Sequence, residues 1–417
     1  MEITTSPTPH SIEHHLPHNL LVNIVDGAFF GFALGFASFG TILPLFVDRL
    51  TDSALLIGLV PALHNLGWQL PQLFTAQRVA RLPRFKGMVL LNTLQERLPF
   101  LLLAGVAGAL LIGWLNSATA LWITLLLLAW QGLGGGITAV AWQSMIGKII
   151  PARRRGAFLG MQAGAANLLL GFSAVLAGWL LQTYPNETGF MYTFLLAACF
   201  MGVSFFFLAQ TREEQHQPDL TAHDQSLWNA AATILRRDAP FRRFLLIRNL
   251  TQFGLMGANF YIIYLSRTFE ASPLLLGWMT SVLSGSQIFI NPLMGWLGDK
   301  YSHRTALLIG GTAALGSALI AWRAPTAEWF FLVFLLLAVA NVAAWVIAIA
   351  LTLEFGTLSE RPVYIGLANT LTAPSTILAP ILGGWLADTY GFSATFFAAI
   401  LFSLITLPLL WSLPKSK

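Results

Sequence analysis

Twelve long apolar runs, most of them separated by only a few residues, constrain this chain more than any other feature of its sequence. A helix needs about 20 mainly apolar residues to cross the hydrocarbon core of a bilayer, and each run has roughly that length. The composition agrees, because only 10% of the residues are charged, whereas a soluble domain has about 25%. We therefore predict an all-α integral membrane protein with spanning helices at 19–46, 54–76, 88–114, 119–147, 157–182, 189–210, 244–266, 274–297, 305–322, 327–352, 363–387 and 392–412.

Lys and Arg are distributed unevenly among the breaks between these runs. Arg49, Arg267 and Arg323 fall on one side of the predicted membrane and Arg97 and Arg248 inside predicted helices, whereas all the others fall on the opposite side. Because Lys and Arg favour the cytoplasmic side, we expect cytoplasmic termini and a location in the plasma membrane. The predicted parts are a tail (1–18), a six-helix bundle (19–210), a charged linker (211–241) and a second six-helix bundle (242–413).

The two predicted bundles contain related segments. VLAGWLLQTY at 175–184 and ILGGWLADTY at 381–390 share six of ten residues at a displacement of 206 positions. Elsewhere the displacement is about 219, which aligns Gly58 with Gly277. Many transporters build their site between such repeats, so we interpret the chain as a six-plus-six duplication.

One loop has a specific pattern. Residues 295–304, between predicted helices 274–297 and 305–322, read GWLGDKYSHR. This segment resembles a loop signature of the major facilitator superfamily, and the resemblance implies two pseudo-symmetric six-helix bundles. It also implies a cytoplasmic gate in which the Asp meets basic residues at the start of predicted helix 157–182, where a helix N-terminus and Arg side chains both stabilise a carboxylate. The gate residues implied are Gly295, Asp299, Lys300, Arg304, Arg153, Arg154, Arg155 and Arg361.

Several ionisable residues fall inside predicted helices, where they are costly and face the interior of a bundle. Asp26 and Arg248 stand at related places in the two halves, so we expect them to face a central cavity and to pair in at least one state. They are either coupling groups or a gating salt bridge that never touches a solute. Glu96 and Arg97 are candidates for structural ion pairs with other helices. His64 is either a proton-exchanging group or a neutral hydrogen-bonded side chain.

A set of aromatic and amide side chains completes the candidate site. Cavities for small organic ligands combine such groups, although we expect only a minority of them to touch a solute. The full set of substrate or coupling candidates is Asp26, His64, Trp130, Gln131, Trp142, Gln143, Arg248, Gln252, Asn259, Asn341 and Trp345.

The resemblance implies a secondary active transporter that moves a small organic solute by alternating access. We expect the lipid bilayer, the solute and a proton or another coupling ion as its partners, no nucleic acid, and a monomer. Two alternatives stay open: a non-transporting assembly factor, chaperone or sensor with the same fold, and an integral-membrane enzyme acting on lipid. The sequence contains no phosphate-binding loop, zinc-ligand spacing or nucleophile elbow, so we expect no enzyme activity, cofactor or metal.

Overall fold

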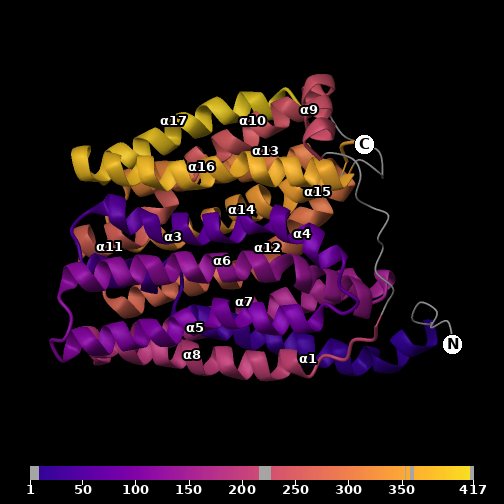
Figure 1. Cartoon of the computed structure of the whole chain (residues 1–417). Helices are drawn as coiled ribbons and strands as arrows, with labels where there is room; N and C mark the ends of the chain where they lie inside the picture. Colours follow the sequence, from indigo (N-terminus) through magenta and orange to yellow (C-terminus); the bar gives the residue numbers. More distant parts are fainter. Residues whose placement is uncertain (1–8, 216–226, 353, 357–360, 414–417) are drawn as a thin grey trace.

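The computed structural model describes residues 9–215, 227–352, 354–356 and 361–413, and every regular element in these ranges is a helix. The N-terminal half, indigo to pink in Figure 1, lies beside the C-terminal half, which runs from rose through orange to yellow. The N-terminal half consists of α1 (Pro9–Phe36), α2 (Ile42–Asp48), α3 (Ala54–Gln69), α4 (Pro71–Ala80), α5 (Lys86–Leu111), α6 (Ser117–Ile149), α7 (Ala152–Thr183) and α8 (Glu187–Ala209). The C-terminal half consists of α9 (Leu227–Arg237), α10 (Ala239–Gly254), η1 (Met256–Phe260), α11 (Tyr261–Phe269), α12 (Pro273–Lys300), α13 (His303–Arg323), α14 (Trp329–Val342), η2 (Ala343–Ile347), α15 (Ala348–Thr352), α16 (Arg361–Tyr390) and α17 (Phe392–Trp411).

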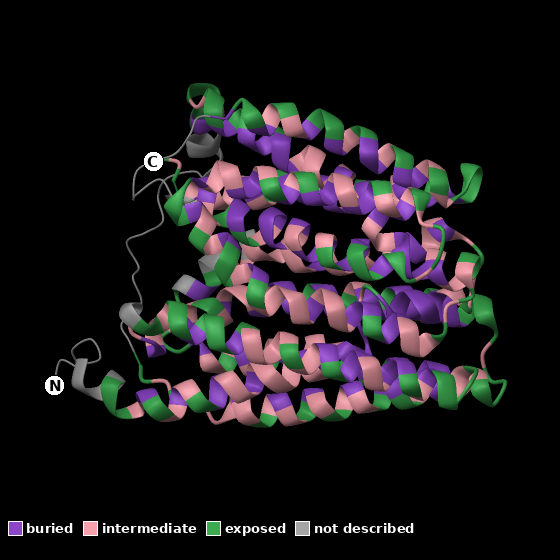
Figure 2. Ribbon diagram, turned by 180° about the vertical axis from the view of Figure 1, so that it is seen from behind, coloured by how far each residue is buried: buried purple, intermediate pink, exposed green. Residues whose placement is uncertain are grey.

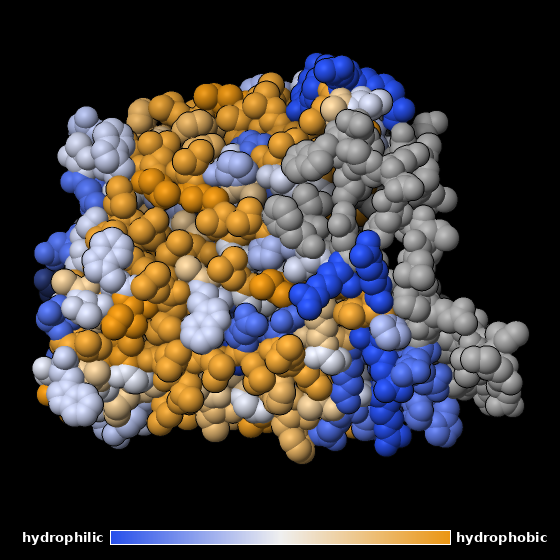
Figure 3. All heavy atoms as spheres, viewed as in Figure 1, coloured by the Kyte–Doolittle hydropathy of each residue, from blue (hydrophilic) through white to orange (hydrophobic). Residues whose placement is uncertain are grey.

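The start of α1 and the end of α17 lie at the same end of the molecule, which we call the termini side (Figure 1). The opposite end, which carries the connections 49–53 and 270–272, is the loop side. Between these ends, hydrophobic side chains dominate the visible face (Figure 3). Buried residues follow the faces that the helices turn toward one another (Figure 2). The apolar outer face is the surface expected of helices in lipid.

Ten helices in the described ranges are long and apolar enough to cross a membrane. Two further passages are broken and fail the length criterion as single helices: α3 with α4, and α10 with η1 and α11. Together these account for the twelve predicted spans, so the predicted fold class is confirmed.

The breaks in the helices have local causes. Pro71 has no backbone N–H, and α3 gives way to α4 at this residue. In the C-terminal half, the Leu255 N–H is shared between the carbonyl groups of Thr251 and Gln252, at 3.0 and 3.2 Å, and the chain tightens into the 3-10 helix η1. The π-helix η2 interrupts the passage from α14 to α15. Such irregular turns are frequent at functional sites.

The two halves meet through the pairs α3–α16 and α7–α12. Glycines bring the backbones together, because a Cβ at Gly384 would lie 2.5 Å from Leu55 Cα, and one at Gly178 would lie 2.4 Å from the Pro273 carbonyl oxygen. Gly178 and Gly384 are equivalent at the displacement of 206, and Gly58 and Gly277, which make the same kind of approach, are equivalent at 219. The two contacts are therefore related by the duplication.

Some predicted boundaries differ from the structure. Helix α1 begins at Pro9, within the predicted tail, and α9 lies within the predicted linker. Residues 227–237 contain three consecutive alanines and end in Leu-Arg-Arg, all good helix formers. The first predicted span is divided at residues 37–41 into α1 and α2. There the Ser38 carbonyl accepts from Thr41 N and Leu43 N, at 3.3 and 3.0 Å, in place of a regular helical ladder.

Candidate functional site

A cavity of about 360 Å³ lies between the two halves, and we call it the central cavity. Three helix breaks line it: residues 38–41 between α1 and α2, the residues Leu255, Ala258 and Asn259 at η1, and Trp345 in η2. Five of the predicted candidates line it as well. They are His64, Gln252, Asn259, Asn341 and Trp345.

His64 is held in place on two sides. Its Nδ1 lies 2.8 Å from Gln131 Oε1 on α6, and its ring stacks on Phe39 with centroids 3.9 Å apart. With the Gln131 oxygen as acceptor, Nδ1 carries the proton and Nε2 is the acceptor. Gln131 is 1% exposed and does not line the cavity itself. It positions His64, a pairing that the sequence did not reveal.

Among the described residues, the lining of the central cavity combines polar side chains with a larger apolar surface and carries no charged side chain. Its lining residues include amides, hydroxyl groups and one imidazole, and no Asp, Glu, Lys or Arg. Aromatic side chains, Phe39, Phe334 and Trp345, supply flat apolar surface. Such a lining can donate and accept hydrogen bonds, but it offers no fixed charge to neutralise an ion.

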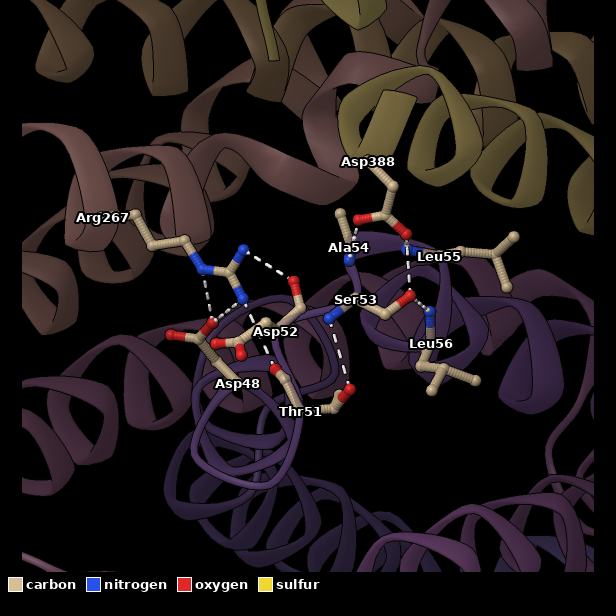
Figure 4. Close-up of polar contacts among 9 residues, drawn as sticks. All are labelled: Asp48, Thr51, Asp52, Ser53, Ala54, Leu55, Leu56, Arg267 and Asp388. Atoms are coloured by element: carbon tan, nitrogen blue, oxygen red, sulfur yellow. Dashed lines mark hydrogen bonds and ion pairs between the residues drawn. The ribbon is translucent and has the colours of Figure 1, made fainter. Parts of the chain in front are cut away.

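On the loop side, Arg267 of the C-terminal half joins the connection after α2 in the N-terminal half (Figure 4). Its Nε and Nη2 lie 2.7 and 2.6 Å from Asp48 Oδ1. Nη1 donates to the Asp52 carbonyl at 3.0 Å, and Nη2 donates to the Thr51 carbonyl at 3.4 Å. Burial raises the pKa of the Asp48 carboxyl, and the positive charge of Arg267 opposes this shift.

Asp388, at the end of α16, caps the N-terminus of α3 in the other half (Figure 4). Its carboxylate accepts from Ser53 Oγ at 2.7 Å, from the Ala54 N–H at 2.5 Å and from the Leu55 N–H at 3.0 Å. Unpaired N–H groups and the helix dipole make this a favourable place for a carboxylate. We call the Arg267 and Asp388 contacts together the loop-side gate.

The loop-side gate is closed in this structure. Thr41 and Thr280 add a hydroxyl–hydroxyl contact between the halves next to the central cavity. Among the described residues, the hydrogen bonds that join α1–α8 and their connections to α10–α17 are those of Thr41, Arg267 and Asp388.

Among the described residues, Asp299 forms no contact with the basic residues predicted for the gate on the termini side. Asp299 has an 83% exposed side chain, and its contact is with His303 on the next helix, at 3.9 Å. Arg155 donates from Nε to the Ile150 carbonyl at 2.9 Å, and Arg304 donates to the Leu413 carbonyl at 2.7 Å. Lys300 lies over the ring of Trp296. Gly295 lies in α12 and Arg154 is exposed, while the side chains of Arg153 and Arg361 lie outside the described set.

A second cavity, of about 450 Å³, lies within the N-terminal half, and we call it the N-half cavity. Asp26, Glu96 and Arg97 line it, together with Trp142 and Gln143. Arg97 Nη2 lies 3.3 Å from Asp26 Oδ1. Ser204 Oγ donates to the same Asp26 oxygen at 2.6 Å and accepts from Arg97 Nη2 at 2.9 Å.

The structure places Asp26 and Arg248 apart, in contrast to the expectation that both face the central cavity. Arg248 lines a small cavity of about 30 Å³ within the C-terminal half, and its Nη1 has no hydrogen-bond partner among the described residues. Asp26 precedes the break at Ser38 by 12 residues, about 18 Å along a helix. This offset explains why it lines another cavity. Trp130 is 37% exposed and lines none of these three cavities.

Sequence reasoning missed the loop-side gate, although a signal for it was present. Asp48 and Arg267 are separated by 219 positions, the displacement that aligns Gly58 with Gly277. Opposite charges at equivalent positions of the repeat therefore do meet between the halves. In this structure the pair that meets is Asp48 and Arg267, and not the predicted pair of Asp26 and Arg248.

These features define a class of protein: a helical membrane protein built from two related halves around a central cavity. Residues 96–263 and 244–417 each match the model of the Major Facilitator Superfamily. The two matches cover more than half of the chain, so the chain belongs to this superfamily, as its resemblance predicted. It is therefore an integral membrane protein. No curated protein sequence matches it.

Solved structures of three kinds of transporter share the fold. A POT family transporter in complex with 5-aminolevulinic acid is 12% identical with a TM-score of 0.71, covering 94% of each chain. A D-xylose-proton symporter is 16% identical with a TM-score of 0.71, covering 97% of this chain and 99% of that one. The nucleoside transporter NupG is 13% identical with a TM-score of 0.71, covering 95% and 99%.

Proposed function

We propose that this protein is a secondary active transporter that moves a small, uncharged, polar organic solute by alternating access. The observation that carries the proposal is the central cavity, which lies between the halves, is lined by three broken helices and is closed by the loop-side gate. Sites formed by discontinuous helices at a repeat interface suit a mechanism in which one half rocks against the other.

The uncharged class of solute follows from the lining. A charged group that leaves water for a site without a counter-charge loses several kcal/mol of solvation. The lining residues of the central cavity supply no such charge, whereas Gln252, Asn259 and Asn341 supply donors and acceptors. A hydroxylated solute of about monosaccharide or nucleoside size fits this chemistry, and the aromatic rings suit its flat apolar faces.

The driving force in this proposal is an ion gradient, with a proton as the coupling ion. The D-xylose-proton symporter of the same fold is one solved transporter whose name includes a proton. We also propose the plasma membrane with the termini side in the cytoplasm, because Lys and Arg concentrate there. Cysteines at Ser117 and Ser412 test this orientation, since an impermeant reagent added to intact cells should label only Ser117→Cys.

Uptake into proteoliposomes tests the proposed function. Four probes cover the alternatives: D-xylose and uridine as uncharged solutes, and a dipeptide and 5-aminolevulinic acid as zwitterions. We expect an imposed proton gradient to drive accumulation of an uncharged probe. Gln252→Ala, which removes a lining amide, should lower uptake about five- to tenfold, the cost of one lost hydrogen bond. Gln182→Ala, at an exposed position of α7, is the matched control.

Each result decides between alternatives. Accumulation of zwitterions alone would contradict the uncharged solute and keep the transporter. A folded protein that moves none of the four probes would contradict the proposal and favour an assembly factor or a sensor.

A further inference from the structure

The N-half cavity contains more negative than positive groups. Its titratable lining residues are Asp26 on α1 and Glu96 and Arg97 on α5, and its lining residues on α3, α6, α7 and α8 carry no charge. With both carboxyls ionised, the site has one net negative charge within a membrane-spanning bundle. An uncompensated charge at such a depth is unfavourable, so the site favours an additional proton or cation.

The hydrogen bonds show which carboxyl is already compensated. Asp26 Oδ1 accepts hydrogen bonds from Arg97 Nη2 at 3.3 Å and from Ser204 Oγ at 2.6 Å. Glu96 accepts a single long hydrogen bond, from Thr93 Oγ1 at 3.5 Å, and forms no ion pair within the described ranges. Through its contacts with Asp26 and Ser204, Arg97 faces α1 and α8. Glu96 points in a different direction, because neighbouring residues of a helix point about 100° apart. Among the described residues, Glu96 is therefore the cavity carboxyl without an ion pair.

The surroundings of Glu96 suit a proton better than a metal cation. Its Oε1 lies against α6, where a Cβ at Gly135 would be 3.1 Å away, and the same Cβ would lie 3.4 Å from Trp68 Cδ1. A metal cation needs several oxygen ligands around it, whereas Thr93 Oγ1, 3.5 Å from Glu96 Oε2, is the one side-chain oxygen within hydrogen-bond reach of Glu96 among the described residues.

The helices next to Glu96, α3 and α6, also carry His64 of the central cavity and its hydrogen-bond partner Gln131. Trp68 and Gly135 lie one turn beyond His64 and Gln131 on α3 and α6, and His64 is hydrogen-bonded to Gln131. The two helices are in backbone contact here, since a Cβ at Gly136 would lie 2.4 Å from the Gly67 carbonyl oxygen. Close-packed elements of this kind transmit a local displacement. A change of charge at Glu96 thus acts on the turn that positions His64.

From this geometry we propose that Glu96 is the coupling acid: it binds the proton that drives transport, while Asp26 stays paired with Arg97. The proton comes from water on one side of the membrane, bonds to a Glu96 carboxylate oxygen to give the neutral acid, and leaves to water on the other side. This inference rests on the proposed ion-coupled transport and assigns its proton to a cavity separate from that of the solute.

Infrared difference spectroscopy on the full-length protein in lipid vesicles tests the proton site without any solute. Acidification should produce the carbonyl band of a protonated carboxyl in the wild type, and Glu96→Gln should abolish it. Glu96→Gln has the shape of the neutral acid, so we expect it to fold. Dicyclohexylcarbodiimide, which modifies protonated carboxyls in apolar surroundings, should label the Glu96 peptide in the wild type. Asp26→Asn, if it folds, should retain the band.

A band that persists in Glu96→Gln, or that disappears in Asp26→Asn with labelling at Asp26, would overturn the assignment to Glu96. So would a carboxylate signal that responds to sodium and not to pH. Transport separates the two proposals. With a probe that the wild type accumulates, Glu96→Gln should reduce the accumulation ratio to one while exchange between equal pools continues. Loss of the band without loss of accumulation would reject Glu96 as the coupling acid and leave the transporter intact.

Discussion

Arg267 links the two halves through every nitrogen of its guanidinium group, so its replacement should weaken the loop-side gate. Its side chain is 30% exposed, and a partly exposed ion pair contributes about 1 kcal/mol or less. Arg267→Ala should therefore raise the open population on the order of fivefold. Spin labels at Arg49 and Ala271, with Cys199 replaced by Ser, measure the distance across the gate. Arg267→Lys keeps the charge but not the three donor nitrogens of the guanidinium group, so its open population should lie between those of the wild type and Arg267→Ala. An unchanged distance distribution in Arg267→Ala would contradict a role of Arg267 in closing the gate.

Asp48 should make the gate sensitive to pH. Burial in the closed gate raises the pKa of its carboxyl, whereas in an open gate water restores the ordinary value. The closed state thus binds a proton more readily, so lowering the pH should favour closure, and raising it through the pKa of the closed state should favour opening. The same spin labels report this shift, and Asp48→Asn should remove it. Opening of the gate on acidification would contradict a raised pKa of Asp48 in the closed state.

The sequence predicts some residues of the candidate site but not how their side chains pair. The duplication identified opposite charges at equivalent positions, but periodicity does not show which face of a helix meets which neighbour. Asp26 met Arg97 because α5 and α1 both adjoin α8 in one half, a fact of tertiary packing. The positions of His64, Gln252, Asn259 and Asn341 on the cavity lining agree with the tendency of polar side chains in spans to avoid lipid. That tendency does not cover tryptophan: Trp345 lines the cavity, whereas Trp130 is 37% exposed.

Among the helices, the close approach of α16 to α3 depends on Gly384. A Cβ there would lie 2.5 Å from Leu55 Cα, with no flexible side chain to move aside. Gly384→Leu should therefore destabilise the closed loop side by about 1–3 kcal/mol, the usual effect of overpacking. The spin-label distance across the gate should lengthen. Gly366→Leu is the matched control on the same helix, because a Cβ at Gly366 meets open space. Equal effects of both substitutions would contradict a specific contact.

Helix existence was predictable, and helix interruption was not. Pro71 coincides with a break, yet Pro61, Pro99 and Pro292 lie inside helices that continue. Bonds to neighbouring helices, side chains and water compensate for a proline in one place and not in another. The breaks that line the central cavity are therefore set by packing between helices, which a single sequence does not specify.

For the whole molecule, the number of spans and the two related halves followed from apolar length and internal repetition, because both are properties of the chain itself. The state of the gates did not follow, because the same sequence must support both a closed and an open loop side. The loop-side gate is assembled in this structure, whereas the contact of Asp299 among the described residues is with His303. A contact between Asp299 and the basic gate residues stays a prediction.

Locking the loop-side gate tests alternating access through the central cavity most directly. Thr41 and Thr280 meet through their hydroxyl groups, so cysteines at both positions, with Cys199 replaced by Ser, should form a disulfide between the halves. Proteoliposome uptake of the probe that the wild type accumulates is then measured before oxidation, after oxidation and after reduction. We predict full loss of uptake on oxidation and recovery on reduction, whereas oxidation should not change the uptake of either single cysteine variant. Undiminished uptake by a fully cross-linked protein would contradict alternating access through this cavity.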